Sequence, residues 1–259
     1  PEDMRAIPPK GSTVVIANHP FGGIDGVLLA SILSSIRTDV RILANYFLGR
    51  VPEIRPLLFQ VDPFGKKSSI NRNKMALKEA VRWVRGGGLL MVFPAGEVSH
   101  FSWKTKKIED PDWEETVARI IRWTRARVVP VYFKGRNSLA FQIAGLIHPL
   151  LRTLMLPREM LRKQSTHFYL KICSTISYRR IAGITRDSDL TAYLRFRTYL
   201  LGNAFDRTPG FLNTPVIKRA ARKRLEPIVA PKATADLIRE IDGFSDQQLL
   251  STHGNLQAY

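Results

Sequence analysis

Short apolar runs alternate with longer amphipathic segments along most of the chain. A continuous apolar run bounded by turn residues predicts a buried strand, and apolar residues that recur every three or four positions predict a helix. The expected strands are Thr13–Ala17, Val40–Ala44, Leu57–Val61, Leu89–Phe93, Val128–Phe133 and His167–Ser174. The expected helices are Gly26–Ser35, Ser68–Arg85, one that starts at an Asp112/Glu115 capping box and runs to Arg125, and Asp187–Asn203. This alternation predicts an α/β fold with a mostly parallel central sheet flanked by helices.

The composition changes after residue 205. Prolines become frequent, and five of the eight residues in Ile217–Arg224 are Lys or Arg. Such a segment is typical of a solvated linker that contains a basic helix. We therefore expect one folded domain at residues 1–205, followed at residues 206–259 by a basic linker and the start of a second domain.

One apolar stretch, Leu139–Leu156, has two interpretations. It is too interrupted by polar residues to span a bilayer, which takes a run of roughly 18 apolar residues. Its basic flanks suit a helix that lies in the membrane interface, whereas its apolar content suits a buried core helix. The pattern favours neither.

The charge of the chain points to a polyanionic partner. Its 259 residues include 40 Lys and Arg but only 22 Asp and Glu, which gives a net charge of +18. Nucleic acid, an anionic membrane surface or an acidic carrier protein would each fit. Cys173 is the single cysteine, which excludes an internal disulfide and a cysteine-rich zinc site, and we expect no metal site.

Two polar segments follow predicted strands. Asn18-His19-Pro20 comes directly after Thr13–Ala17, with Asp25 six residues beyond His19, and the segment Phe93–Ser99 follows Leu89–Phe93. The carboxyl ends of parallel strands meet at one edge of a sheet, so the two segments are expected to converge there. A lone histidine more often caps a turn, and this convergence is what favours chemistry at His19.

These motifs resemble a known family. NHPFGGID (18–25), FPAGEVS (93–99) and then VVPV (128–131), in this order, resemble the PlsC-like phospholipid/glycerol acyltransferases, the lysophospholipid acyltransferase superfamily. The resemblance implies a glycerol-3-phosphate acyltransferase-like fold and acyl transfer from an acyl carrier protein or coenzyme A thioester to a hydroxyl of a lysolipid acceptor. It also implies that His19 is the general base, that Asp25 orients it, and that no cofactor is needed beyond the acyl-ACP or acyl-CoA co-substrate.

The resemblance also implies a set of substrate-binding residues. Glycine-rich backbone would supply N–H donors to the oxyanion, and cationic side chains would bind an acceptor phosphate. The expected set is Asn18, Phe21, Gly22, Gly23, Lys66, Lys67, Arg72, Phe93, Pro94, Gly96, Glu97 and Ser99.

The sequence departs from the family pattern in ways that bear on the acceptor. Five residues rather than four separate His19 from Asp25, Ala95 stands where the family has glutamate, and Val98 stands where it has arginine. Without the phosphate-binding arginines, only Lys66, Lys67 or Arg72 remain for that role, so an acceptor without phosphate is favoured.

This variant pattern resembles the hemolysin-like and ornithine-lipid O-acyltransferase subgroup, in which some members are fused to an N-acyltransferase of the GNAT type. It implies a bacterial enzyme bound peripherally, as a monotopic protein, to the cytoplasmic face of the inner membrane, with lyso-ornithine lipid as acceptor. The alternatives are a 1-acylglycerol-3-phosphate acyltransferase and a non-catalytic membrane-binding scaffold. A nucleic-acid-binding module is a third alternative, but no nucleic acid partner is expected because no RNA-binding aromatic motif or zinc pattern is present.

Overall fold

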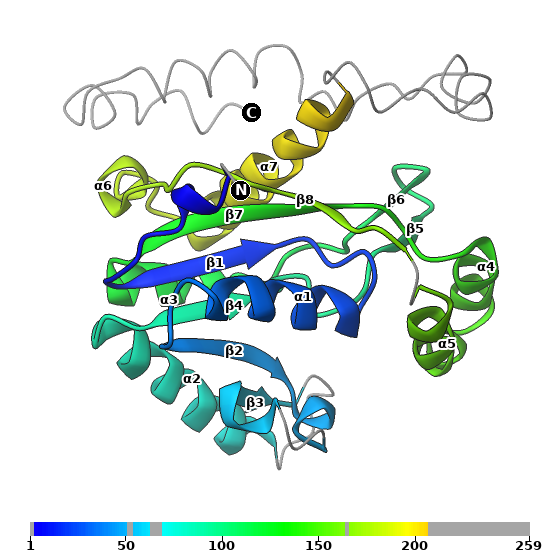
Figure 1. The fold of residues 1–259 in the computed structure, drawn as a ribbon, viewed down its shortest axis with the longest axis horizontal. Helices are drawn as coiled ribbons and strands as arrows, with labels where there is room; N and C mark the ends of the chain where they lie inside the picture. The colour runs from blue at the N-terminus through cyan, green and yellow to red at the C-terminus, as the bar shows by residue number, and fades with distance from the viewer. Residues whose placement is uncertain (1–2, 51–53, 63–68, 164–165, 207–259) are drawn as a thin grey trace.

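The computed structural model describes residues 3–50, 54–62, 69–163 and 166–206 (Figure 1). Lys66, Lys67 and residues 207–259 of the predicted linker and second domain lie outside the described residues. The fusion to an N-acyltransferase that some members of the subgroup carry stays a prediction for this protein.

A six-stranded sheet with the order β3-β2-β4-β1-β7-β8 forms the centre of the fold. All neighbouring strands pair in parallel except β7 and β8, which are antiparallel. The mostly parallel sheet is therefore confirmed. The strands are β1 Thr13–Ala17, β2 Val40–Asn45, β3 Leu58–Val61, β4 Leu89–Val92, β7 Arg127–Lys134 and β8 Tyr169–Ile172.

Helices cover both faces of this sheet. The α-helices are α1 Gly23–Ser34, α2 Ser69–Arg85, α3 Thr116–Thr124, α4 Leu139–Ile147, α5 Pro149–Arg162, α6 Tyr178–Ile181 and α7 Asp187–Asp206. The short 3₁₀-helices are η1 Asp3–Ala6, η2 Tyr46–Arg50 and η3 Arg55–Leu57. A small hairpin, β5 His100–Ser102 and β6 Lys107–Glu109, lies outside the main sheet.

Burial on both faces explains why the central strands are continuous apolar runs. In β4, Leu90 packs with residues of α2, α3 and α7, whereas its neighbour Met91 packs with Leu29 and Leu33 of α1 on the opposite face. Successive side chains of a strand point to opposite faces, so each position in such a strand must be apolar.

Most predicted elements are present, with shifts at their ends. The helix after β1 begins at Gly23 rather than Gly26, so Asp25 lies in its first turn. The predicted capping box at Asp112 and Glu115 is wrong: α3 begins at Thr116, and its N-cap Glu115 makes no side-chain capping hydrogen bond. The β5–β6 hairpin was not predicted, since strands of three residues are too short to show a period.

The apolar stretch Leu139–Leu156 forms two helices rather than one. It folds into α4 and most of α5, with a break at His148, whose backbone is extended. The α4–α5 hairpin lies beyond the carboxyl ends of β1 and β7, beside the start of α1 (Figure 1). Of the helices in the described ranges, none is both long and apolar enough to cross a bilayer.

Candidate active site

The segment between β1 and α1 places His19 and Asp25 side by side. Asn18 extends β1 toward β7, because its side-chain amide donates to the Phe133 carbonyl at 3.0 Å and accepts from the Phe133 N–H at 2.7 Å. Gly22 then turns the chain with φ of 82°, a conformation that favours glycine. The loop therefore returns on itself within a few residues, and the first turn of α1 faces His19.

Asp25 is fully buried behind the histidine. Its Oδ2 accepts hydrogen bonds from the N–H groups of Phe21 at 2.8 Å and Gly22 at 3.1 Å. Burial raises the pKa of Asp25 above its ordinary value of 3.8, although the neighbouring His19 ring and these two N–H groups act in the opposite direction. The carboxylate is thus held in one position by the backbone that precedes it.

The imidazole of His19 has one side against Asp25 and one side open. Its Nδ1 lies 3.1 Å from Asp25 Oδ2, and the ring stacks on Phe93 with centroids 4.2 Å apart. At this distance, neither His19 Nδ1 nor Asp25 Oδ1 has a hydrogen-bond partner of good geometry among the described residues. Catalytic pairs are often imperfectly aligned before substrate binds. The side chain is 17% exposed, and no described residue bonds to Nε2, so this nitrogen can reach a substrate hydroxyl.

Asp110 joins the two motif segments, and sequence analysis did not identify it. Its Oδ1 accepts from the backbone N–H of His19 at 3.1 Å and from the Ser99 hydroxyl, while its Oδ2 accepts from Trp113 Nε1 at 3.0 Å. The Ser99 N–H also donates to the His19 carbonyl at 2.9 Å. Burial raises the pKa of Asp110, opposed by the Ser99 and His19 hydrogen bonds. The predicted convergence of the two segments is therefore present, and this carboxylate holds it.

The rest of the second motif forms a turn whose glutamate faces α5. Gly96 has φ of 67°, and its N–H closes the turn on the Phe93 carbonyl at 3.0 Å. The side chain of Glu97 is 58% exposed, and its Oε2 lies 2.6 Å from Nη2 of the nearly buried Arg152. Arg152 is a second residue that sequence analysis missed, because it appeared there only as an interruption of an apolar stretch.

Several predicted substrate-binding residues have other contacts in the structure. Ser99 is buried and donates its hydroxyl to Asp110, and both ends of the Asn18 amide bond to Phe133. Phe21 is buried, with its ring edge-on to Phe168.

The remaining predicted residues are more widely placed. The Pro94 carbonyl accepts from Glu114. Gly23 faces Met160 of α5, with 3.6 Å between the sulfur and the position that a Cβ on Gly23 would take. Arg72, on α2, is exposed, and its Nη2 lies 3.6 Å from Asp62 Oδ2 rather than against the His19 loop.

The described residues include no group of three or more His, Cys, Asp or Glu side chains arranged to hold a metal ion. At this edge of the sheet, an imidazole lies against a buried carboxylate, within two loops rich in backbone N–H groups.

Comparison with known proteins places this site in context. The sequence model of a family described as Acyltransferase matches residues 1–208. A relative from Phocaeicola vulgatus, named Lyso-glycine lipid O-acyltransferase, is 31% identical over 183 residues, which cover 68% of this chain and 63% of the relative. A protein of the same name from Bacteroides thetaiotaomicron is 31% identical over 142 residues, covering 52% of this chain and 47% of that protein. The chain thus spans less than two thirds of either relative.

Among solved structures, the chain is similar to the 1-acyl-sn-glycerophosphate acyltransferase PlsC from Thermotoga maritima. The TM-score is 0.48 and the sequence identity is 17%, over 79% of this chain and 70% of the other.

Proposed function

This chain belongs to the PlsC-like acyltransferase family, and from that premise we propose that it transfers an acyl group from a thioester to the hydroxyl of a lysolipid. The observation that carries the proposal is the His19–Asp25 pair, with Nδ1 of the ring 3.1 Å from the carboxylate and Nε2 open. A base placed in this way can activate a hydroxyl without any covalent intermediate on the protein.

In the proposed mechanism, His19 first accepts a proton from the acceptor hydroxyl and then donates it to the leaving thiolate. Nε2 removes the proton of the acceptor hydroxyl as its oxygen attacks the thioester carbonyl carbon. The tetrahedral intermediate then collapses, the carbon–sulfur bond breaks, and the imidazolium returns the proton to the leaving sulfur. Asp25 stabilises the imidazolium that exists between the two steps and keeps Nδ1 protonated. The products are the O-acylated lipid and the free thiol of the carrier.

The oxyanion requires N–H donors that are not already in use. Of the three glycines considered from the sequence, Gly22 donates to Asp25 and Gly96 donates to the Phe93 carbonyl. Gly23 is the first residue of α1, where a backbone N–H has no acceptor within the helix. We therefore assign the oxyanion donor to Gly23, at the positive end of the α1 dipole.

The acceptor that we propose is a lysolipid with an amino-acid head group and no phosphate. Arg152 is the cation in contact with the second motif, and its charge is balanced by Glu97 at 2.6 Å, which leaves it poorly suited to a phosphate dianion. The two relatives are named for a lyso-glycine lipid. We therefore propose lyso-glycine lipid as an acceptor in addition to the predicted lyso-ornithine lipid. The donor is an acyl-ACP or acyl-CoA thioester.

The test is release of free thiol from acyl-ACP and acyl-CoA, with lyso-glycine lipid, lyso-ornithine lipid and lysophosphatidate offered in parallel. We expect turnover with the amino-acid lipids and its loss in His19→Ala, while His167→Ala, which changes an exposed histidine, keeps full activity. Turnover on lysophosphatidate alone would contradict the proposed acceptor. A folded protein without turnover on any acceptor, or an active His19→Ala variant, would contradict the proposed chemistry.

A further inference from the structure

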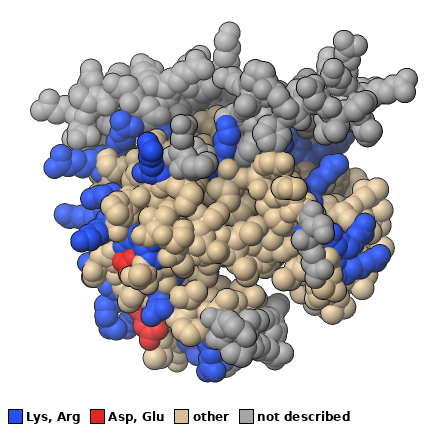
Figure 2. All heavy atoms as spheres, viewed as in Figure 1, with Lys and Arg blue, Asp and Glu red and all other residues tan. Residues whose placement is uncertain are grey.

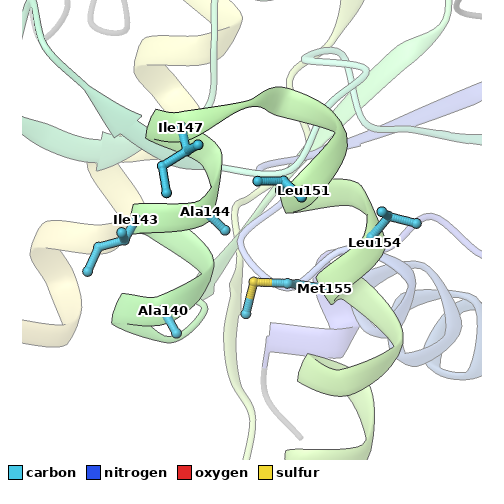
Figure 3. A pocket seen from close by; sticks show the side chains of 7 residues that line it. All are labelled: Ala140, Ile143, Ala144, Ile147, Leu151, Leu154 and Met155. Carbon is cyan, nitrogen blue, oxygen red and sulfur yellow. The ribbon is translucent and has the colours of Figure 1, made fainter.

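The α4–α5 hairpin exposes a continuous apolar surface. Leu139 and Ile147 of α4 and Leu154 of α5 are 75%, 72% and 74% exposed. Between the helices lies an apolar groove of about 440 Å³, to which both contribute side chains (Figure 3). Its lining residues are Ala140, Ile143, Ala144, Ile147, Leu151, Leu154 and Met155. Isolated exposed leucines are common on soluble proteins, whereas a contiguous patch of this kind marks an interaction surface.

The inner side of the hairpin is fixed to the domain, so the apolar surface is a stable feature of the fold. Phe141 is fully buried, and the buried Gln142 accepts from the Phe101 N–H at 2.9 Å. On α5, the buried Glu159 accepts from the N–H of Ser138 at 3.0 Å and from Lys163 Nζ at 2.7 Å. The hairpin thus buries two polar side chains and leaves large aliphatic ones exposed, which is unusual for helices that face only water.

The charges around the patch favour an anionic partner. Arg136, Arg158 and Arg162 border it and are exposed, whereas Glu159 of α5 is buried and paired. Figure 2 shows Lys and Arg side chains on this side of the molecule. An apolar surface bordered by exposed cations matches an anionic bilayer, in which acyl chains lie beneath negative head groups. A second copy of a chain with a net charge of +18 would bring the same cations against each other.

The patch adjoins the catalytic loop. A Cβ on Gly22 would lie 3.1 Å from Leu156 Cδ2, so α5 packs directly on the turn that orients Asp25. We propose that the α4–α5 hairpin is the surface by which this protein docks on an anionic lipid bilayer, with its apolar residues inserted and the His19 loop facing the membrane. This inference deepens the proposed function, but vesicle binding needs no turnover and tests it separately.

The experiment is cosedimentation of the 259-residue chain with vesicles of phosphatidylglycerol and of phosphatidylcholine. The double variant Ile147→Asn/Leu154→Gln is expected to bind phosphatidylglycerol vesicles at least about tenfold more weakly, since each exposed aliphatic side chain loses its transfer into lipid. The control is Met75→Gln, which changes a 63% exposed apolar residue on α2 and should bind like wild type. Ile217–Arg224 is the same in all these proteins, so any difference reports the hairpin.

Substitutions of the bordering arginines, melting temperatures and the oligomeric state test the inference further. Arg158→Gln/Arg162→Gln should weaken binding to phosphatidylglycerol and leave the weaker binding to phosphatidylcholine unchanged. All variants should keep the wild-type melting temperature, because the changed side chains are exposed. Equal binding by wild type and Ile147→Asn/Leu154→Gln would overturn the inference, as would an equal loss in Met75→Gln. If wild type is a dimer in sedimentation equilibrium and Ile147→Asn/Leu154→Gln is a monomer, the patch binds a second copy instead, and the inference is wrong.

Discussion

Asp25→Asn tests whether the buried carboxylate acts through its charge. Oδ2 of Asp25 faces His19 Nδ1 at 3.1 Å and accepts from the Phe21 and Gly22 N–H groups. The oxygen of asparagine can take this position and keep both backbone hydrogen bonds. The substitution then removes the negative charge beside the imidazole and places the amide Nδ2 where the unpaired Oδ1 lies.

The expected loss follows from the separation of the two groups. Unit charges about 4 Å apart, at an effective dielectric of about 20, attract by about 4 kcal/mol. This sets the scale of the stabilisation that the imidazolium loses, and about 1.4 kcal/mol corresponds to a factor of ten in rate. We therefore expect kcat to fall by about 10²–10³-fold, with KM for the acceptor nearly unchanged, because Asp25 is fully buried and touches no substrate.

The same substitution should change how the stability of the fold depends on pH. The pKa of Asp25 is raised above 3.8 in the folded protein, so the stability contributed by its protonated form is complete below about pH 3.8 and is lost as pH rises through the folded-state pKa. Asparagine has no such proton to lose. The free energy of unfolding of Asp25→Asn, relative to that of wild type, should therefore rise as pH rises through that window.

The assay is thiol release under saturating donor, combined with urea unfolding at pH values from about 4 to about 8. Asp189→Asn is the control, since Asp189 is exposed on α7 with Arg186 at 3.8 Å, and a surface pair of this kind contributes little. A kcat within about threefold of wild type would refute the role of Asp25, and a stability difference that does not shift toward the variant as pH rises would refute the argument from burial.

Two further substitutions test the loops. Gly22→Ala should lower kcat, and it should lower the free energy of unfolding by at least about 1 kcal/mol, because φ is 82° and the new Cβ would lie 3.1 Å from Leu156. Urea unfolding measures the stability, and an unchanged free energy of unfolding would contradict the predicted strain. Ser99→Ala should cost about 1–3 kcal/mol of stability, since the buried Asp110 carboxylate loses a hydroxyl donor, but should change kcat less than tenfold. A larger kcat loss at unchanged stability would place Ser99 at the substrate.

The position of the His19–Asp25 pair was predictable because the pair is local. β1 has the bounds expected from its apolar run, and His19 and Asp25 are six residues apart around a glycine turn. The convergence of Phe93–Ser99 on His19 was also predictable, since parallel strands bring their carboxyl ends to one edge. Hydrophobic period and chain direction are properties of the sequence that any compact α/β packing must respect.

The contacts that hold this site depend instead on tertiary structure. Asp110 accepts a hydrogen bond from the backbone N–H of His19, which is 91 positions away in the sequence. Arg152 pairs with Glu97, which is 55 positions away. No local pattern marks either residue, because each acquires its role only when distant elements pack together. By composition alone, the apolar stretch at Leu139–Leu156 was equally consistent with a buried core helix and with a helix in the membrane interface. The fold exposes much of it, because the two faces of the sheet are already covered by α1 and by α2, α3 and α7, which leaves the α4–α5 hairpin at the edge beside the His19 loop.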